Sequence, residues 1–297
     1  MEDRKDFVGG SDAAAALGLS RWSSPLKLWA EKTGKIEPED ISDREYVEMG
    51  NELEDTVARL FTKRTGFAVR RAPKNYQHKT YAFMRCQVDR LLVGTDELLD
   101  CKTCAAWKAK EWEGDEIPGE YIIQVMYQLG ITGRSVGWLA VLIGGQTFRY
   151  KRIDFDKEMY DGIVSGVVAF WKMVQDKTPP MAIGMDTGFI AELFPNSDEQ
   201  VQEIESMNDA IALLQETKMH IKELDKTKDD CEAKIKQAIG DHAGIKTSQY
   251  VITWKTQSRT AVDVEALKEA KLYDQFTKSS QARVLRVAKN KKGAENE

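Results

Sequence analysis

The chain has 297 residues, with 43 Lys and Arg against 48 Asp and Glu, a formal net charge of −5 and 42% hydrophobic residues, enough for a folded core. No apolar run approaches the ~20 residues of a membrane span, and the polar N-terminus MEDRKDF is unlike a secretory signal. The acidic balance does not exclude a nucleic-acid partner, because local basic patches govern that affinity.

Residues 4–20 start with Arg4 and continue through Gly9-Gly10 into an alanine-rich stretch. This pattern predicts a helix with Ser11 or Asp12 as its N-cap. Two glycines and a helix N-terminus beside an arginine are typical of a phosphate site. A plain capped helix is the alternative.

Two further helices are expected before the first strand. Residues 23–33 carry Pro25 at the first turn, and residues 43–65 repeat apolar residues at helical spacing. Glu54 lies on or beside the apolar stripe, where an acid is costly unless it is paired. Its neighbours Glu52 and Asp55 are predicted to be surface residues.

Residues 67–83 interleave basic and aromatic side chains: Arg70, Arg71, Lys74, Tyr76, Lys79 and Tyr81. Such a stretch suits a surface that follows a nucleic-acid backbone, and it equally suits a charged loop.

Residues 86–102, CQVDRLLVGTDELLDCK, predict two strands joined by a turn at Gly94. Alternation along the second strand places Asp100 and Lys102 on one face and Leu99 and Cys101 on the other. If the first strand lies beside it, Asp89 faces Asp100, and two carboxylates and an amine converge.

Carboxylates this close need a cation, because like charges raise each other's pKa. Oxygen ligands without histidine favour Mg²⁺ or Mn²⁺ over Zn²⁺. The alternative is a charged hairpin with a solvated outer face. Cys101 and Cys104 are expected to be packing residues, and four cysteines fit a reducing compartment. We therefore expect a cytoplasmic protein.

Residues 119–133 predict an apolar helix that carries Gln124 and, one turn on, Gln128. Two strands around Gly144-Gly145 and a closing helix over 157–176 follow. The breaker at 178–180 then predicts a boundary, with a domain over 1–180 and an appendage over 181–297.

The appendage begins with a long helix or helical hairpin of coiled-coil type over 198–239. A strand over 248–256 follows. The stretch 275–294 contains no acid and several basic residues, including Arg283, Lys289, Lys291 and Lys292. It is either a DNA-binding tail or a frayed terminus.

An Asp followed by Asp-x-Lys resembles the PD-(D/E)XK nuclease signature. Its flanking stretches FVGGSDAAAALGLSRWSSPLKLWAEKTG, MGNELEDTVARLF, YIIQVMYQLGITG and WLAVLIGGQ resemble the YqaJ-like viral recombinase family, relatives of the lambda-type exonuclease. The resemblance implies an α/β (α+β) restriction-endonuclease-like core, a mixed sheet flanked by helices, followed by a C-terminal helical and small β appendage.

The resemblance also implies site roles. The metal ligands, for two Mg²⁺ or Mn²⁺ ions, are Asp89, Asp100, Glu54 and the carbonyl of Cys101. Lys102 and Gln124 orient and activate the attacking water, and Arg4 and Ser11 hold the DNA 5′-phosphate. Asp100 stands where most relatives carry glutamate. Further candidate DNA contacts are Arg21, Trp22, Lys27, Lys108 and Gln128.

The function that follows is a Mg²⁺-dependent exonuclease on double-stranded DNA ends, 5′ to 3′, that leaves 3′ single strands for phage-type recombination. Implied partners are a single-strand annealing protein and further copies of the chain in a trimeric ring, in a phage or prophage protein of a bacterial host. The alternatives are an endonuclease with the same site and a non-catalytic DNA-binding scaffold.

Overall fold

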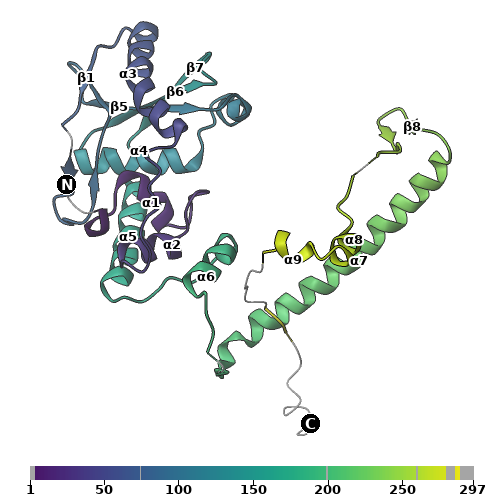
Figure 1. The fold of residues 1–297 in the computed structure, drawn as a ribbon. Coiled ribbons are helices and arrows are strands. Elements are labelled where there is room, and N and C mark those ends of the chain that lie inside the picture. The colour runs from purple at the N-terminus through teal and green to yellow at the C-terminus, as the bar shows by residue number, and fades with distance from the viewer. Residues whose placement is uncertain (1–3, 74, 199, 259, 279–284, 288–297) are drawn as a thin grey trace. The chain divides into compact units, whose positions relative to one another are not determined.

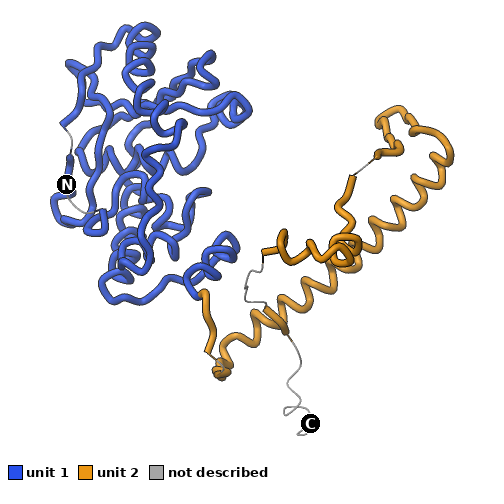
Figure 2. Tube along the Cα trace, in the orientation of Figure 1, with its two compact units in different colours: residues 1–194 blue, residues 195–297 orange. Residues whose placement is uncertain are grey.

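The computed structural model describes residues 4–73, 75–198, 200–258, 260–278 and 285–287. The chain divides into two compact units, residues 1–194 and 195–297 (Figure 2). Lys74 and most of the basic tail, including Arg283, Lys289, Lys291 and Lys292, lie outside the described residues.

Unit 1 is built on a five-stranded mixed sheet in the order β1-β4-β5-β6-β7. The strands are β1 (Val69–Arg71), β4 (Arg90–Leu92), β5 (Glu97–Cys104), β6 (Val136–Ile143) and β7 (Thr147–Asp154). Only β5 and β6 run parallel, and they pair Asp100 with Leu139. The two strands predicted around Gly144-Gly145 are β6 and β7, and both glycines have positive φ at their turn.

Helices cover both faces of this sheet, as predicted (Figure 1). Helix α3 (Glu45–Thr65) packs on one face, and α4 (Gly119–Thr132) packs on the other. Behind α4 lie α1 (Gly10–Ala16), α2 (Pro25–Lys32) and α5 (Lys157–Gln175). Because strand residues alternate, Leu99 and Cys101 pack toward α3, whereas Leu98 belongs to the larger core on the α4 side. Asp100 and Lys102 therefore face α4.

The start of α1 differs from the prediction. Its N-cap is Gly9, and Asp12 sits inside the first turn, where its Oδ2 accepts a hydrogen bond from the Gly9 amide at 3.1 Å. The capping carboxylate thus reaches back to the cap from within the helix, and Ser11 is left exposed. Pro25 opens α2, as predicted, and Ser24 is its N-cap.

The hairpin over 86–102 is confirmed, with Gly94 at positive φ and Arg90 opposite Leu99. Its first strand is interrupted, however. Cys86 ends a short strand, β3 (Arg85–Cys86), that pairs with β2 (Tyr76–Gln77), and β4 begins only at Arg90. Asp89 lies between the two strands, so its side chain is free to reach the neighbouring β5.

The stretch after Pro180 still belongs to unit 1. The 3₁₀ turn η3 (Gly184–Asp186) buries Asp186, which accepts a hydrogen bond from the Ser24 hydroxyl, and helix α6 (Thr187–Leu193) adds Phe189 and Ile190 to the main core. These contacts place the boundary between the units after residue 194, later than the predicted position.

Unit 2 contains one long helix, α7 (Asn208–Ile239), and not a helical hairpin. It also has a small hairpin of β8 (Gly244–Lys246) and β9 (Val251–Thr253), and short helices α8 (Val264–Glu269) and α9 (Tyr273–Phe276). The 3₁₀ helices η1 (Arg4–Asp6), η2 (Ala106–Trp112) and η4 (Glu205–Met207) complete the described elements. No helix within the described ranges has the length and apolarity to cross a membrane.

Candidate active site

A buried carboxylate and an ammonium form the centre of the candidate site. On β5, Lys102 Nζ lies 2.6 Å from Asp100 Oδ2, and Asp100 is only 1% exposed. From α4, the amides of Gln124 and Gln128 donate to Asp100 Oδ1 at 3.1 and 3.0 Å. One oxygen of Asp100 is therefore held by two amides, and the other faces the lysine.

Lys102 is positively charged at neutral pH. Burial alone would lower the pKa of its amine, but the carboxylates of Asp100 and Asp89 outweigh burial and raise it. The ring of Tyr121 lies below the ammonium, with its centroid 5.6 Å from Nζ. A protonated lysine in this position can donate hydrogen bonds and stabilise negative charge, but it cannot act as a base.

Asp89 joins this pair from the residue directly before β4. Its Oδ2 accepts a hydrogen bond from the Cys101 amide at 2.7 Å. Burial, and next the charge of Asp100, raise the pKa of Asp89 to about 7. The structure thus brings Asp89, Asp100 and Lys102 together, as the hairpin pattern predicted, and leaves excess negative charge in a buried place.

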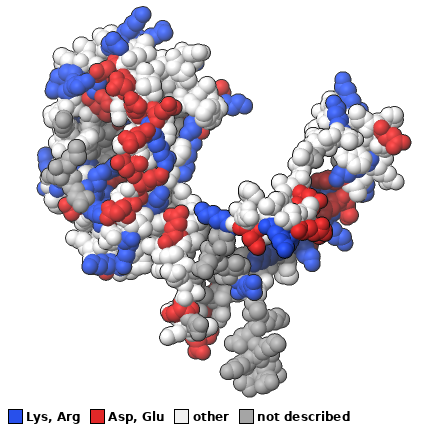
Figure 3. All heavy atoms as spheres, in the orientation of Figure 1, with Lys and Arg blue, Asp and Glu red and all other residues white. Residues whose placement is uncertain are grey.

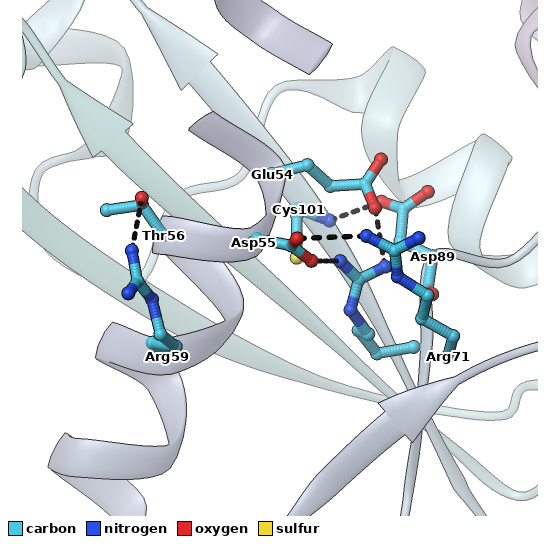
Figure 4. Close-up of polar contacts among 8 residues, drawn as sticks. Glu54, Asp55, Thr56, Arg59, Arg71, Asp89 and Cys101 are labelled. Carbon is cyan, nitrogen blue, oxygen red and sulfur yellow. Dashed lines mark hydrogen bonds and ion pairs between the residues drawn. The ribbon is translucent and has the colours of Figure 1, made fainter. Parts of the chain in front are cut away.

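Glu54 approaches the same place from α3, the opposite layer (Figure 4). Its charge contributes to the raised pKa of Asp89, and its Oε1 accepts a hydrogen bond from the guanidinium of Arg90. Arg90 is buried and also donates to Asp55, which binds Arg71 at 2.9 Å as well. Asp55, predicted to be a plain surface residue, is exposed but pairs with two arginines.

The residues fit a hard divalent cation through their oxygen atoms. Asp100 Oδ2 is buried and accepts no hydrogen bond of normal geometry from the described residues, although Lys102 neutralises it. Asp89, Asp100 and the Cys101 carbonyl supply the donors that Mg²⁺ and Mn²⁺ prefer. In the described part of the chain, no three His, Cys, Asp or Glu side chains already form a metal-holding group. Among the predicted ligands, Glu54 differs from the others because its carboxylate is already bound by Arg90.

Gln128 was predicted as a DNA contact, and this prediction is wrong. The side chain is 1% exposed, and its Nε2 donates to the Gln87 carbonyl and to Asp100, both at 3.0 Å. It faces the sheet because it lies one turn after Gln124 on the same face of α4. Gln128 therefore orients Asp100 and does not meet solvent.

Replacing Gln128 by leucine is expected to destabilise the fold by roughly 1–3 kcal/mol, because the Gln87 carbonyl and Asp100 lose a buried donor. Urea unfolding monitored by circular dichroism measures the loss. Gln77→Leu, at an exposed position, is the control and should unfold at nearly the wild-type midpoint. A Gln128→Leu midpoint equal to that of wild type would contradict the assigned contacts.

The predicted phosphate anchors lie at the start of unit 1. Arg4 is largely exposed and reaches Asp12 Oδ1 at 3.4 Å, and Ser11 is exposed in the first turn of α1. Asp12 is also paired with Lys32 at 2.8 Å. This end of α1 thus carries cations on both sides of a single carboxylate.

The remaining predicted DNA contacts cluster near a cavity of about 1140 Å³. Trp22, Lys27 and Lys108 line it together with Arg4, and the Lys108 ammonium lies 4.2 Å from the centroid of the exposed Trp22 ring. Thr103 and Tyr121 also line the cavity, so it opens beside Lys102. Arg21 instead forms ion pairs with Glu111 and Glu120.

Two residues with evident roles were not predicted. Arg90 links Glu54 to Asp55, and Tyr121 lies under Lys102. A signal for Arg90 was present, since a charged residue inside the apolar run VDRLLV must find partners when it is buried. The position of Tyr121 depends on how α4 packs on the sheet, which local sequence does not reveal.

Comparisons with known proteins identify the family of this chain. A family model described as the YqaJ-like viral recombinase domain matches residues 1–135. The protein YqaJ of Bacillus subtilis (strain 168), itself uncharacterized, is 34% identical over 278 residues, which cover 90% of this chain and 86% of that one.

Among solved structures, the alkaline exonuclease LHK-Exo of Laribacter hongkongensis superposes with a TM-score of 0.51 at 20% identity, and its complex with dAMP with a TM-score of 0.50 at 22%. Each of the two alignments covers 64% of this chain and 96% of the LHK-Exo chain. The likeness to these chains confirms the predicted fold, a mixed sheet flanked by helices.

Proposed function

We propose that this chain, which belongs to the YqaJ-like viral recombinase family, is a metal-dependent nuclease. It would degrade double-stranded DNA from its ends. The observation that carries the proposal is the meeting of Asp89, Asp100 and Lys102 in one buried place. The neighbouring structure LHK-Exo is an alkaline exonuclease and was solved with dAMP, which supports a nucleotide substrate for this fold.

Asp89, Asp100 and the Cys101 carbonyl would hold the divalent ions, with Glu54 completing the set. When bound, Mg²⁺ or Mn²⁺ supplies a water of lowered pKa and stabilises the charge on the phosphate. Glu54 can serve either Arg90 or an ion, and the excess negative charge around Asp89 favours the ion.

Lys102, protonated by its carboxylate neighbours, would donate to the attacking water or to the phosphate oxygen beside it. Gln124 and Gln128 would keep Asp100 in a fixed orientation, which differs from a direct role for Gln124 on the water. The shorter arm of Asp100, in place of glutamate, is compatible with its burial against α4 and would influence the choice of metal.

Recognition of a DNA end would use the cavity beside Lys102. Arg4 and Ser11 would hold a 5′-phosphate, and Trp22, Lys27 and Lys108 would contact the strand. Arg21 is less suited to this role because two glutamates already pair with it. A ring of three copies and a single-strand annealing protein would complete the recombination function.

We expect Mg²⁺-dependent loss of nucleotides from a linear duplex that carries a 5′-phosphate, and no cleavage of a covalently closed circle. Degradation should stop when the 5′ ends are blocked and continue when the 3′ ends are blocked. A time course with the label on each end in turn measures both. Cutting of the closed circle would favour the endonuclease, and binding without cleavage in Mg²⁺ or Mn²⁺ would favour the scaffold.

A further inference from the structure

A second cleft lies on the α3 side of the sheet, directly beyond Arg90. It has a volume of about 610 Å³ and is bounded by α3, β1 and the first residue of β4. Four arginines line it, namely Arg59, Arg70, Arg71 and Arg90, whereas Asp55 is the only acid among the described residues of its lining. Figure 3 shows Lys and Arg side chains gathered over the region of β1.

The single acid is already shared. Arg71 and Arg90 stand opposite each other in the β1–β4 register, and both guanidiniums donate to Asp55. Figure 4 shows the contact between Arg71 and Asp55. Asp55 therefore offsets the repulsion between two adjacent cations. Each of its two oxygens already accepts a hydrogen bond from one of these arginines.

The other two arginines of the cleft, Arg59 and Arg70, have guanidinium groups that can bind an anion. Arg59 lies one turn after Asp55 on α3 and donates to the neutral Thr56 hydroxyl at 3.0 Å. Arg70 is exposed on β1, an edge strand. Among the described residues, neither Arg59 nor Arg70 forms an ion pair with an acid. Two guanidiniums with free donors thus face an open cleft.

The shape of the cleft suits a chain of phosphates. Ala58, Ala68 and Val69 supply small apolar side chains in its lining, so a polymer backbone can approach closely. Arg71 and Asp55 have side chains 76% and 59% exposed, which shows that the cleft is open to solvent. Guanidinium groups match phosphate oxygens in pairs of parallel hydrogen bonds.

The cleft is also connected to the candidate active site through one side chain. Arg90 donates to Glu54 on one side and to Asp55 on the other, and Glu54 contributes to the charge around Asp89. The Arg90 side chain therefore lies between a ligand in the cleft and the carboxylates that would hold the metal.

We propose that this arginine cleft binds backbone phosphates of a DNA strand next to the bond that is cut, with Arg59 and Arg70 as the phosphate contacts. The inference rests on the proposed nuclease function and adds a second DNA surface, which shares no lining residue with the cavity of Arg4. Asp55 and Arg71 keep Arg90 in place between the surface and the metal ligands.

The double variant Arg59→Gln/Arg70→Gln tests the proposal in the full-length protein. Binding of a fluorescent linear duplex is measured by anisotropy without divalent metal, over a range of salt concentrations. We expect about a 10-fold or greater loss of affinity at moderate salt and a salt-dependence slope smaller by about 2, since each lost phosphate contact removes roughly one counterion. In Mg²⁺, KM for DNA should rise while kcat changes less than about twofold.

The matched control is Lys63→Gln/Arg64→Gln, which removes two exposed cations from the same helix outside the cleft lining. An equal loss in the control would show a general charge effect and overturn the proposal, as would wild-type affinity and slope in the Arg59/Arg70 variant. If wild-type protein binds inorganic phosphate in a calorimetric titration, and the cleft variant loses only that binding, the cleft is a free-anion site and the proposal is again overturned.

The same preparations separate this inference from the proposed function. Wild-type protein that cleaves DNA, together with a cleft variant that binds normally, refutes the cleft alone. Wild-type protein that never cleaves, together with a cleft variant that binds weakly, refutes the nuclease function but retains the cleft as a DNA surface.

Discussion

Replacement of Lys102 by alanine is expected to lower the rate of DNA cleavage by at least ~100-fold while DNA affinity stays within about twofold. The ammonium is 2.6 Å from Asp100 and is kept protonated by Asp100 and Asp89, so its charge acts where the phosphate reacts. It is largely enclosed and contributes little to binding DNA from solvent. Single-turnover cleavage of a labelled linear duplex and anisotropy without metal measure the two quantities separately.

The variant also alters the metal-free fold, because Asp100 would remain buried without its cation. Removing one partner of a buried ion pair costs about 3–5 kcal/mol, so the thermal midpoint should fall. Mg²⁺ should restore part of this loss, since it replaces the missing positive charge. Lys110→Ala, an exposed position on η2, is the control and should cleave at the wild-type rate. Unchanged cleavage by Lys102→Ala would remove Lys102 from the mechanism.

Replacement of Asp89 by asparagine is expected to abolish cleavage and, at alkaline pH, to stabilise the metal-free protein. The pKa of Asp89 is raised to about 7 by burial and by Asp100, whereas an unfolded aspartate titrates near 3.9. Between these values the folded state binds more protons than the unfolded state, so stability falls as pH rises. The full cost, roughly 4 kcal/mol at most, is present above pH 7 and absent below pH 4.

Asparagine carries no charge at any of these pH values and can still accept the hydrogen bond from the Cys101 amide. The thermal midpoint of Asp89→Asn should therefore exceed that of wild type by an amount that grows from pH 5 to pH 8. Mg²⁺ should raise the midpoint of wild type at pH 8 but not that of the variant. Asp115→Asn, at an exposed position, should follow wild type throughout. A pH-independent difference would contradict the raised pKa.

The sequence was sufficient to predict those parts of unit 1 that local pattern determines. Apolar residues at helical spacing predicted α3, and two apolar runs around a glycine turn predicted the hairpin of β4 and β5. Alternation then placed Asp100 and Lys102 on one face. These features depend on neighbours within a few residues, so a single sequence contains them.

Other features depend on contacts between distant residues. The boundary after residue 194 follows from Asp186 binding Ser24, and nothing in the local sequence at Pro180 reveals that contact. The sequence allowed Gln128 to contact DNA, but the packing of α4 on the sheet places its side chain against Asp100. Arg90 could be recognised as a residue in need of partners, but not as the link between Glu54 and Asp55.

We propose that Asp89, Asp100 and the Cys101 carbonyl hold a divalent ion. The most direct measurement is anomalous diffraction from crystals of this protein grown or soaked with Mn²⁺. We expect a peak about 2.1 Å from oxygens of both carboxylates and of the Cys101 carbonyl, and we expect it to be lost in Asp89→Asn. A fully ordered site with no peak between them, or a Mn²⁺ ion bound only elsewhere, would contradict it.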